Sequence, residues 1–244
     1  MDKTYELKYH EIEDSHFWFK SRRNYILQLL KDENRNSRIL DIGCSSGLLL
    51  KDLENIGFKK ENLFGIDISK KAIDNCKSNG LNNCFVMSGE NITIQQNFDI
   101  IIASDCLEHI ERDTDAVKNW KQSLKIGGKM FVFVPAFKSL WSNHDVVNMH
   151  FRRYKKKQLT NILIDNQLEI KKSGYWNFTL FLPLYVIRGL SNLFPTKKSK
   201  NNNGDLYNIG LLNKPLLFLL NSENKILNYL NFPFGISTYA IAKK

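Results

Sequence analysis

Short runs of apolar residues constrain the fold of this chain more than any other sequence feature. The run at residues 98–103, Phe-Asp-Ile-Ile-Ile-Ala, is almost unbroken and does not alternate between apolar and polar residues. Such runs are typical of strands buried on both faces, as in a parallel sheet covered by helices on each side. Shorter apolar runs lie at residues 38–42, 63–66, 84–87, 130–134 and 236–242, and residues 168–173 are expected to form a further strand. The pattern predicts a sheet of seven strands.

Segments with helical periodicity lie between these runs, at residues 15–31, 48–56, 69–79, 113–124 and 155–166. Ser15 and Ser69 are expected to cap the helices that they precede. Gly127 and Gly128 are expected to end the helix before the fifth strand, and Pro135 to stop that strand. The alternation predicts an α/β fold with a doubly wound, Rossmann-like, mostly parallel sheet.

The alternation stops near residue 175, where a long apolar and aromatic stretch begins. Residues 175–193 contain Asn177, Pro183 and Arg188, and the remaining apolar part is shorter than the roughly 20 residues of a membrane-spanning helix. Two interpretations stay open for this helical insertion: a lid or extra layer on the domain, or an element at a membrane interface. Residues 197–205 are polar and predict a loop within it.

The chain has 244 residues, which fits one large domain with additions. The predicted divisions are an N-terminal helical cap at 1–36, a core at 37–175, the apolar helical insertion at 176–235 and a closing strand of the core at 236–244. The sequence does not predict an oligomeric state.

The formal net charge of +10 favours either an anionic partner or simply a soluble, lysine-rich surface. Basic clusters lie at residues 152–157 and 197–200, but the chain lacks the basic arm that would favour nucleic acid. The four cysteines have no metal-site spacing, and the first residues lack a secretory signal. These features predict a cytoplasmic protein without a bound metal, with peripheral contact to the inner face of the membrane as an alternative.

A glycine-rich turn, Asp41-Ile42-Gly43-Cys44-Ser45-Ser46-Gly47, follows the first strand. Its glycines permit a tight turn and a close approach of ligand to backbone, and the next helix begins there. The three-glycine pattern of dinucleotide sites is incomplete, and Asp41 would repel a pyrophosphate. A cationic cofactor such as S-adenosyl-L-methionine suits that carboxylate better. Asp67, about 20 residues further on, can accept hydrogen bonds from ribose hydroxyls.

The third motif, Ser104-Asp105-Cys106-Leu107-Glu108-His109-Ile110, follows the fourth strand. With the two preceding motifs it resembles the class I S-adenosylmethionine-dependent methyltransferases over residues 15–175. The aromatic start at residues 16–19 and the apolar insertion are similar to a bacterial group of type 11 and type 23 methyltransferases. Many members of the family have glycine where this chain has Ser45.

The resemblance implies roles for individual residues of the cofactor site. Asp41, Gly43 and Gly47 would surround the methionine moiety, Asp67 would hold the ribose, Glu90 and Asn91 would flank the adenine, and Ser104 and Asp105 would line the methionine side. Cys44 and Ile68 complete the predicted cofactor-binding set. The helix at the aromatic start would cover either the cofactor or only the sheet.

The acceptor site is expected in the loop after the fifth strand, at residues 135–154, because ligands of open α/β sheets bind at that edge. His144 is the first choice for a catalytic base, with Asp145 orienting it or contacting the acceptor, and His150 is the second choice. Arg152 and Arg153 could grip a phosphate, and Trp141 is a predicted substrate contact. Alternatively, His150 and Arg153 form a buried hydrogen-bonded corner without a catalytic role.

The sequence thus predicts an S-adenosylmethionine-dependent methyltransferase, with O-methylation favoured over N- or C-methylation. Its acceptor would be a glycan, a lipid-linked sugar or glycan, or another small metabolite, in line with the surface-polysaccharide and lipid-linked sugar pathways that the resemblance implies. The alternatives are a nucleotide-binding oxidoreductase and a module that binds S-adenosylmethionine without catalysis.

Overall fold

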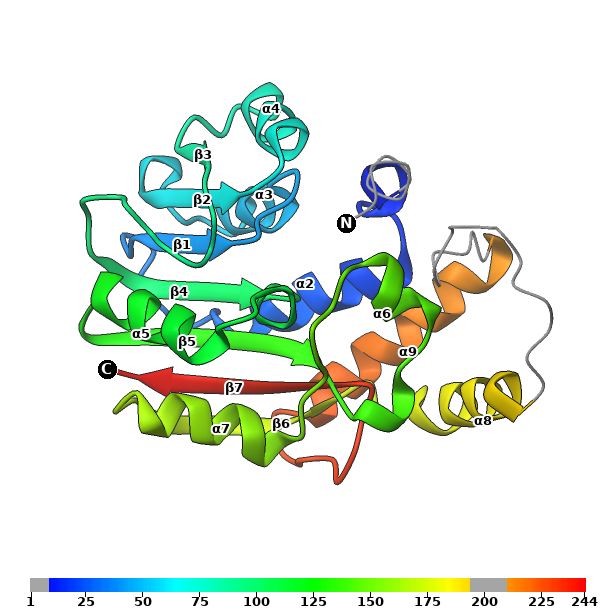
Figure 1. The fold of residues 1–244 in the computed structure, drawn as a ribbon. Helices are drawn as coiled ribbons and strands as arrows, with labels where there is room; N and C mark the ends of the chain where they lie inside the picture. The colour runs from blue at the N-terminus through cyan, green and yellow to red at the C-terminus, as the bar shows by residue number, and fades with distance from the viewer. Residues whose placement is uncertain (1–8, 194–209) are drawn as a thin grey trace.

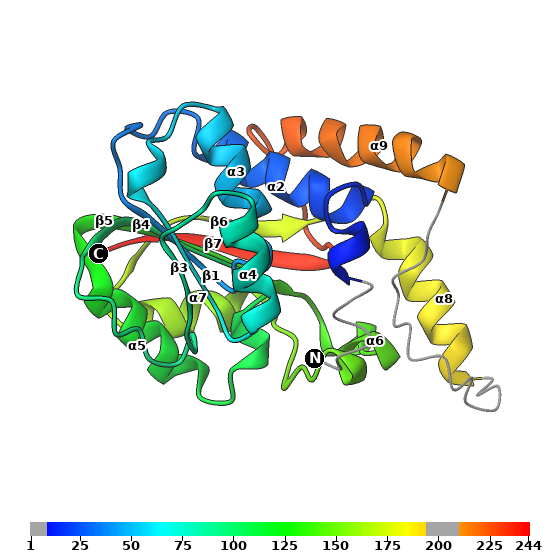
Figure 2. The ribbon, with the colours of Figure 1, turned by 90° about the horizontal axis from the view of Figure 1, so that it is seen from above.

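A computed structural model describes residues 9–193 and 210–244, in which one seven-stranded sheet lies between two layers of helices (Figures 1 and 2). The strand order is β3-β2-β1-β4-β5-β7-β6, and β7 runs antiparallel to both of its neighbours. The strands are β1 (Ile39–Ile42), β2 (Leu63–Asp67), β3 (Cys84–Val86), β4 (Phe98–Ser104), β5 (Leu124–Pro135), β6 (Glu169–Trp176) and β7 (Ser237–Lys243). The predicted fold class is confirmed.

Helices cover both faces of the sheet, as the unbroken apolar strands require. One core contains side chains of α5 (Asp113–Ser123) and α7 (Lys156–Asp165). The other contains side chains of α2 (Phe17–Leu29), α3 (Leu48–Asn55) and α4 (Lys70–Ser78). Because β1 and most of β4 are buried, the central strands contribute apolar side chains to both cores.

The insertion before the last strand forms two helices, α8 (Phe181–Leu193) and α9 (Asn213–Ile226). Figure 2 shows α9 beside α2 on the outside of one layer, whereas α8 points away from the sheet. Polar side chains join α9 to the rest of the fold: Asn224 accepts a hydrogen bond from Trp176 Nε1 at 2.7 Å and donates one to the carbonyl of Ser21 at 2.9 Å. The packed face of α9 is therefore held by amide hydrogen bonds as well as apolar contacts.

Two predicted boundaries are wrong for local reasons. His16, not Ser15, is the N-cap of α2, and its side chain accepts from the N–H of Trp18. Gly127 and Gly128 do not end α5, which stops at Ser123; they lie within β5, where the N–H of Gly127 donates to the carbonyl of Lys244. The predicted cap at Ser69 is confirmed by its hydrogen bond from the N–H of Ala72.

Two other strand boundaries differ from the prediction. Pro135 is the last residue of β5 rather than the residue after it, because its carbonyl still accepts a hydrogen bond, from the N–H of Tyr154. β6 continues through Tyr175 and Trp176, two aromatic residues that the sequence had placed with the insertion.

Within the described ranges, no helix has the length and apolar character needed to cross a membrane. The predicted loop at 197–205 and the basic cluster at 197–200 lie outside the described residues.

Candidate active site

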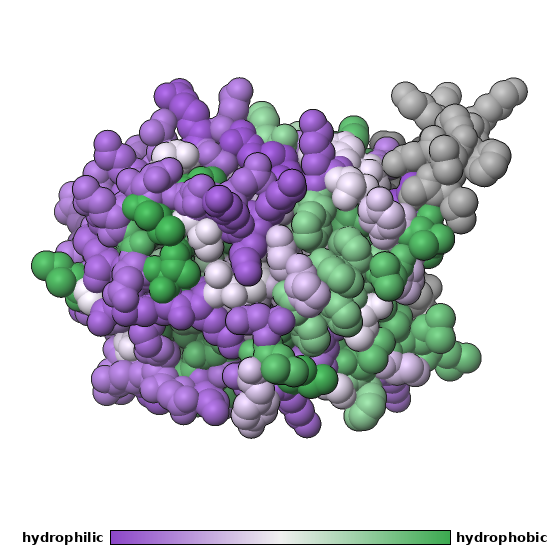
Figure 3. Space-filling model, turned by 90° about the horizontal axis from the view of Figure 1, so that it is seen from below, coloured by the Kyte–Doolittle hydropathy of each residue, from purple (hydrophilic) through white to green (hydrophobic). Residues whose placement is uncertain are grey.

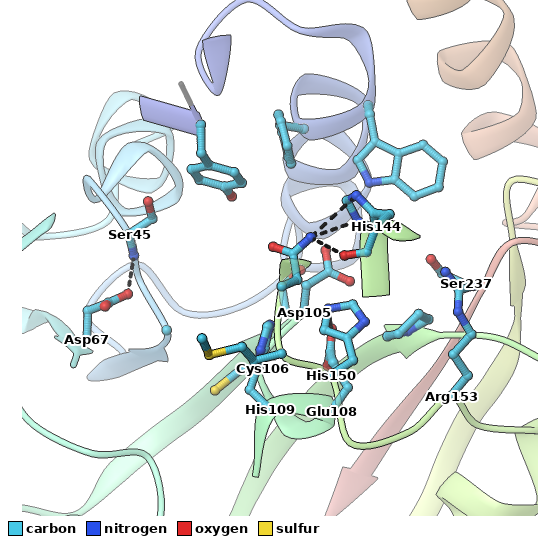
Figure 4. Close-up of a pocket in the computed structure, with 18 of the residues that line it drawn as sticks. Ser45, Asp67, Asp105, Cys106, Glu108, His109, His144, His150, Arg153 and Ser237 are labelled. Atoms are coloured by element: carbon cyan, nitrogen blue, oxygen red, sulfur yellow. Dashed lines mark hydrogen bonds and ion pairs between the residues drawn. The ribbon is translucent and has the colours of Figure 1, made fainter. Parts of the chain in front are cut away.

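A large cavity lies at the carboxyl ends of the parallel strands. Its volume is about 1550 Å³, well above the roughly 300–1,000 Å³ typical of a pocket for one small ligand. Its lining extends from Asp67 at the end of β2 to Leu184 on α8. Figure 4 shows Asp67 at one end of the site, Ser237 at the other, and His150 between them. The cavity therefore has room for a cofactor and an acceptor together.

Asp67 joins two loops at the first end of the cavity. Its Oδ2 accepts a hydrogen bond from the N–H of Ser45 at 3.0 Å, and its Oδ1 accepts one from the N–H of Ser69 at 2.8 Å. These two donors fix the orientation of the carboxylate, which lines the cavity. The remaining lone pairs of a carboxylate can accept hydrogen bonds from ribose hydroxyls.

The glycine-rich turn depends on left-handed backbone at three positions, with φ of 75° at Gly43, 47° at Ser45 and 79° at Gly47. A Cβ at Gly47 would lie 2.5 Å from Leu81 Cδ1, so close packing as well as φ requires glycine there. Ser45 tolerates a conformation that favours glycine, and its hydroxyl donates to Glu13 Oε2 at 2.8 Å. Serine in place of the family's glycine therefore has a structural role at this position.

Glu13 was not predicted as a site residue. Its carboxylate also accepts from the hydroxyl of Ser46 and lies 3.0 Å from His10 Nδ1, while its backbone carbonyl accepts from Arg23 Nη1 at 2.8 Å. The segment before α2 is thereby attached to the turn after β1. No sequence spacing signals such a contact.

Arg22 of α2 organises the centre of the site. Its Nη1 donates to Asp105 Oδ2 at 2.8 Å and to Ser104 Oγ at 3.3 Å, and its Nη2 donates to Ser237 Oγ at 2.9 Å. The guanidinium carbon lies 4.3 Å from the ring centroid of Trp176. The helix that the sequence suggested as a cover thus positions two of the predicted cofactor residues through a buried arginine.

His150 is held by Asp145, not left free in a loop. Asp145 Oδ1 lies 2.9 Å from His150 Nδ1, and the same carboxylate accepts from Arg153 Nε at 2.7 Å and Nη2 at 3.0 Å. Burial acts to raise the pKa of Asp145, but the hydrogen bond from His150 and the charge of Arg153 hold it well below its usual range. Asp145 is therefore ionised and accepts a hydrogen bond from His150 Nδ1–H, so Nε2 is the ring nitrogen that Asp145 does not engage.

His144 does not make the contact with Asp145 that their adjacency in the sequence suggested. It lies on α6 (Asn143–Val147), next to Asp145 in sequence. Consecutive residues of a helix point in directions about 100° apart, so they do not face each other. Asn148 Nδ2 instead lies 3.3 Å from His144 Nε2. The expected orientation of His144 by Asp145 is absent, although His144 does line the cavity.

Glu108, in the short turn Leu107–His109, adds a buried carboxyl group beside His150. It is fully buried and lines the cavity, and neither of its carboxylate oxygens has a hydrogen-bond partner among the described residues. Its Oε1 lies 4.0 Å from His150 Nε2. Burial, and then the charge of Asp105, raise the pKa of Glu108 well above its usual range. These surroundings favour the neutral carboxyl group, which can donate a hydrogen bond to a ligand.

The predicted site residues fall into two groups, those that line the cavity and those that do not. Those that line the cavity are Gly43, Asp67, Ile68, Glu90, Ser104, Asp105, His144, His150 and Arg153. Those that are not in its lining are Asp41, Cys44, Gly47, Asn91, Trp141, Asp145 and Arg152. Arg152 instead pairs with Asp113 at 2.9 Å and donates to the carbonyl of Glu111, so it is already engaged at the surface.

Two groups of described residues bring three potential metal ligands within 4.8 Å of one another: Cys44, Cys76 and Cys84, and Glu108, His109 and His150. The three thiols are buried in one of the hydrophobic cores, whereas the second group lines the cavity. Burial, and then His150, lower the pKa of His109 to about 3, so its imidazole is neutral. The expectation of a site without metal stays a prediction.

Asp41 lies in the middle of β1, with 4% of its surface exposed. Burial, followed by Cys84 and Asp67, raises its pKa from 3.8 to about 8. Between those pH values the unfolded chain binds fewer protons at this position than the folded chain. The free energy of unfolding must therefore fall as the pH rises, by up to about 1.4 kcal/mol per pH unit.

Asp41→Asn removes this titration, so the free energy of unfolding of the variant relative to wild type is expected to increase between pH 5 and pH 8. Urea unfolding at the two pH values measures the difference. Asp99→Asn is the control: burial raises the pKa of Asp99, but Lys125 lowers it further, to below 3.8, so the difference of this variant from wild type should stay constant between pH 5 and pH 8. Identical pH dependence in wild type and Asp41→Asn would contradict the prediction.

The segment that carries these motifs matches a known family. Residues 40–132, from β1 into β5, match the sequence model of a family described as "Methyltransferase domain". Residues 40–132 form a methyltransferase domain. The methyltransferase family that the three sequence motifs predicted is therefore confirmed over this segment. Methyltransferase domains with this fold use S-adenosylmethionine as their cofactor.

Curated relatives of the methyltransferase domain share only this part of their length. A ubiquinone biosynthesis O-methyltransferase of Nitrosococcus oceani is 31% identical over 101 residues, which are 38% of this chain and 42% of the relative. One of Pelagibacter ubique with the same name is 32% identical over 103 residues, or 40% and 42% of the two chains. The chain thus matches about two fifths of the length of these relatives.

Solved structures extend the likeness to the whole fold. A SAM-dependent methyltransferase from Archaeoglobus fulgidus has a TM-score of 0.58 and 20% identity, covering 92% of this chain and 96% of its own. Magnesium protoporphyrin IX methyltransferase from Synechocystis, solved with bound SAH, has a TM-score of 0.51 and 18% identity, covering 63% and 74%. At these identities the likeness shows that this chain, including the strands after residue 132, has the same fold as those structures.

Proposed function

We propose that this chain transfers a methyl group from S-adenosylmethionine to a hydroxyl oxygen of an amphipathic acceptor, with His150 as the base. The observation that carries the proposal is that His150, on the wall of a cavity that begins at Asp67, is paired with the buried Asp145 behind it. The pair provides a proton acceptor, and the cavity has room for a second ligand beside the cofactor.

The residues at the Asp67 end fit S-adenosylmethionine. The carboxylates of Asp67, Glu90 and Asp105 line this part of the cavity, and they suit a ligand with an ammonium, a sulfonium and ribose hydroxyls. Gly43 has no side chain to block the approach, and a Cβ there would meet Cys106 Cβ at 3.2 Å. When bound, S-adenosylmethionine supplies an electrophilic methyl group on sulfur, and the thioether that leaves needs no proton.

The protein then has to align the acceptor and remove one proton. His150 Nε2 takes the proton of the acceptor hydroxyl, while the ionised Asp145 stabilises the imidazolium that forms. Asp145 is kept in place by Arg153 and by the N–H of Ser142 at 2.8 Å. Glu108, whose burial beside His150 favours the neutral carboxyl group, is suited to donate a hydrogen bond to an acceptor oxygen. Alignment within the enclosed cavity supplies the rest of the rate.

The acceptor half of the cavity is largely apolar. Its lining includes Phe17 and Trp18 from the N-terminal segment, Leu180 and Leu184 beside and on α8, and Leu216 on α9. A hydroxyl-bearing head group joined to a hydrocarbon chain fits this wall better than a free sugar. The names of the relatives, which concern biosynthesis of a quinone, support an acceptor of this class, and so does the predicted link to lipid-linked sugars.

The experiment that tests the function uses S-adenosylmethionine with a labelled methyl group and the full chain. A cell extract divided into organic-soluble and aqueous fractions provides the acceptors. Label is expected in the organic fraction. Label only in the aqueous fraction would contradict the acceptor class. Binding of S-adenosylhomocysteine by calorimetry without transfer to either fraction would favour a module that has no catalytic activity.

Asp67→Asn is expected to weaken binding of S-adenosylhomocysteine roughly 10- to 100-fold, because hydrogen bonds to a charged acceptor contribute about 1.5–3 kcal/mol. Titration calorimetry measures the change. Asp74→Asn on the exposed side of α4, where the carboxylate pairs with Lys70, is the matched control and should bind as wild type. Equal affinity of both variants would exclude Asp67 from the cofactor site.

A further inference from the structure

The outer surface of α8 is apolar to an extent that the rest of the fold does not require. Leu182, Tyr185, Val186 and Ile187 are 60%, 46%, 54% and 63% exposed. Figure 3, which views the molecule from below, shows hydrophobic side chains gathered on the side where α8 lies, while the opposite side is mostly hydrophilic. A contiguous apolar surface of this kind marks an interaction site.

Other apolar side chains are exposed at the start of α9 and beside the cavity. Leu211 and Leu212, just before α9, are 97% and 59% exposed, and Phe218 on α9 is 76% exposed. Met149 and Phe151, which line the cavity, are 61% and 52% exposed. The exposed surface and the wall of the cavity therefore share residues, so an occupant of this surface also lies at the cavity.

Positive charges lie beside this surface. Residues 176–193 and 210–222 contain no acidic side chain, and Lys214 at the start of α9 is exposed. Lys138 is exposed in the turn Lys138–Leu140, whose Leu140 carbonyl accepts from Arg188 of α8. A surface with apolar side chains and lysines beside them complements an anionic lipid bilayer.

A second group of lysines lies close to the beginning of α8. Lys156 Nζ is 6.0 Å from the ring centroid of Tyr175. Phe137 stacks on that ring at 5.0 Å and contacts Phe181, the first residue of α8, at 5.6 Å. Lys155 and Lys157, on either side of Lys156, are exposed. The positive charge of residues 155–157 thus adjoins the apolar surface.

We propose that the exposed face of α8, with Leu211, Leu212 and Phe218, docks this protein onto an anionic phospholipid bilayer and places the cavity mouth at the lipid surface. The inference rests on the proposed function in one respect, since an amphipathic acceptor would enter from the bilayer. α8 has 13 residues, fewer than the roughly 20 needed to span, so it lies in the plane of the interface with its apolar side chains among the lipids.

Flotation of the full chain with vesicles tests the docking independently of catalysis. Wild type is expected to float with vesicles containing phosphatidylglycerol, to float much less with pure phosphatidylcholine, and to lose binding as the salt concentration rises. Leu182→Glu with Val186→Glu places two charges one turn apart on α8, and neither residue lines the cavity. The bound fraction of this variant is expected to fall at least tenfold, because each buried apolar side chain contributes strongly.

Ile126→Glu with Ile164→Glu is the matched control, since these residues are 94% and 54% exposed on β5 and α7. It should float as wild type does. Binding of S-adenosylhomocysteine by both variants checks that they fold, and it keeps a failure of docking separate from a failure of the proposed function. Absence of flotation by wild type, or equal loss in both variants, would overturn the proposal. So would a wild-type dimer that the α8 variant converts to a monomer without any vesicle binding, which would make the surface a contact between two copies.

Discussion

His150→Ala is expected to slow methyl transfer by about 10²- to 10⁴-fold, the usual contribution of a positioned general base. The affinity for S-adenosylhomocysteine should stay close to that of wild type, because His150 lies away from the Asp67 end of the cavity (Figure 4). The loss should therefore appear in kcat. Added imidazole is expected to restore part of the rate, since it can occupy the space of the deleted ring and accept the proton. Single-turnover transfer of a labelled methyl group measures both effects.

His144→Ala is the matched control, because His144 also lines the cavity but is not the histidine that Asp145 contacts. Its rate is expected to stay within about tenfold of wild type, below the usual effect of losing a base. A larger loss of rate in His144→Ala than in His150→Ala would favour His144 as the base, as the sequence predicted. Treatment with a chelator separates the base from a metal ligand: activity that EDTA abolishes and a divalent ion restores would assign Glu108, His109 and His150 to a metal site instead.

Arg153→Met is expected to lower the free energy of unfolding by about 3–5 kcal/mol at pH 7, because it leaves a buried carboxylate without its charged partner. The Asp145 side chain is fully buried, and Arg153 is 3% exposed in its side chain. The pKa of Asp145 is depressed below its ordinary value of 3.8, so the stability that the pair contributes is present above that pH and is lost as the pH falls below it. The difference in the free energy of unfolding between wild type and Arg153→Met should therefore become smaller as the pH falls.

Arg152→Met is the neighbouring control. The Arg152 side chain is 33% exposed and pairs with Asp113, and exposed ion pairs contribute about 0–1 kcal/mol. Urea unfolding of both variants at pH 7 and at pH 3 measures the contrast. The double variant Asp145→Asn with Arg153→Met should recover part of the loss, since no unpaired charge remains. Equal stability of the two arginine variants would show that the buried pair does not stabilise the loop.

The sequence alone predicted the sheet and several features of the turns at its edge, because the signals there are local. Apolar runs identify buried strands, and Ser69 and Asp67 act within a few residues of their own positions: Ser69 caps the helix that follows it, and Asp67 accepts from the N–H of Ser69. The left-handed φ values at Gly43 and Gly47 are likewise properties of a short turn. Such features can be inferred from spacing, so the fold class and the methyltransferase domain followed from the chain itself.

Tertiary structure alone decided which side chains from distant parts of the chain meet around the cavity. Glu13 reaches Ser45 from 32 residues away, and Arg22 reaches Ser237 from 215 residues away; neither contact leaves a periodic signal. The choice between His144 and His150 depended on the directions in which a short helix points its residues, and adjacency in sequence favoured the wrong partner for Asp145. Side chains meet at this site because separate elements pack around the sheet, and packing is a property of the whole chain that local patterns do not contain.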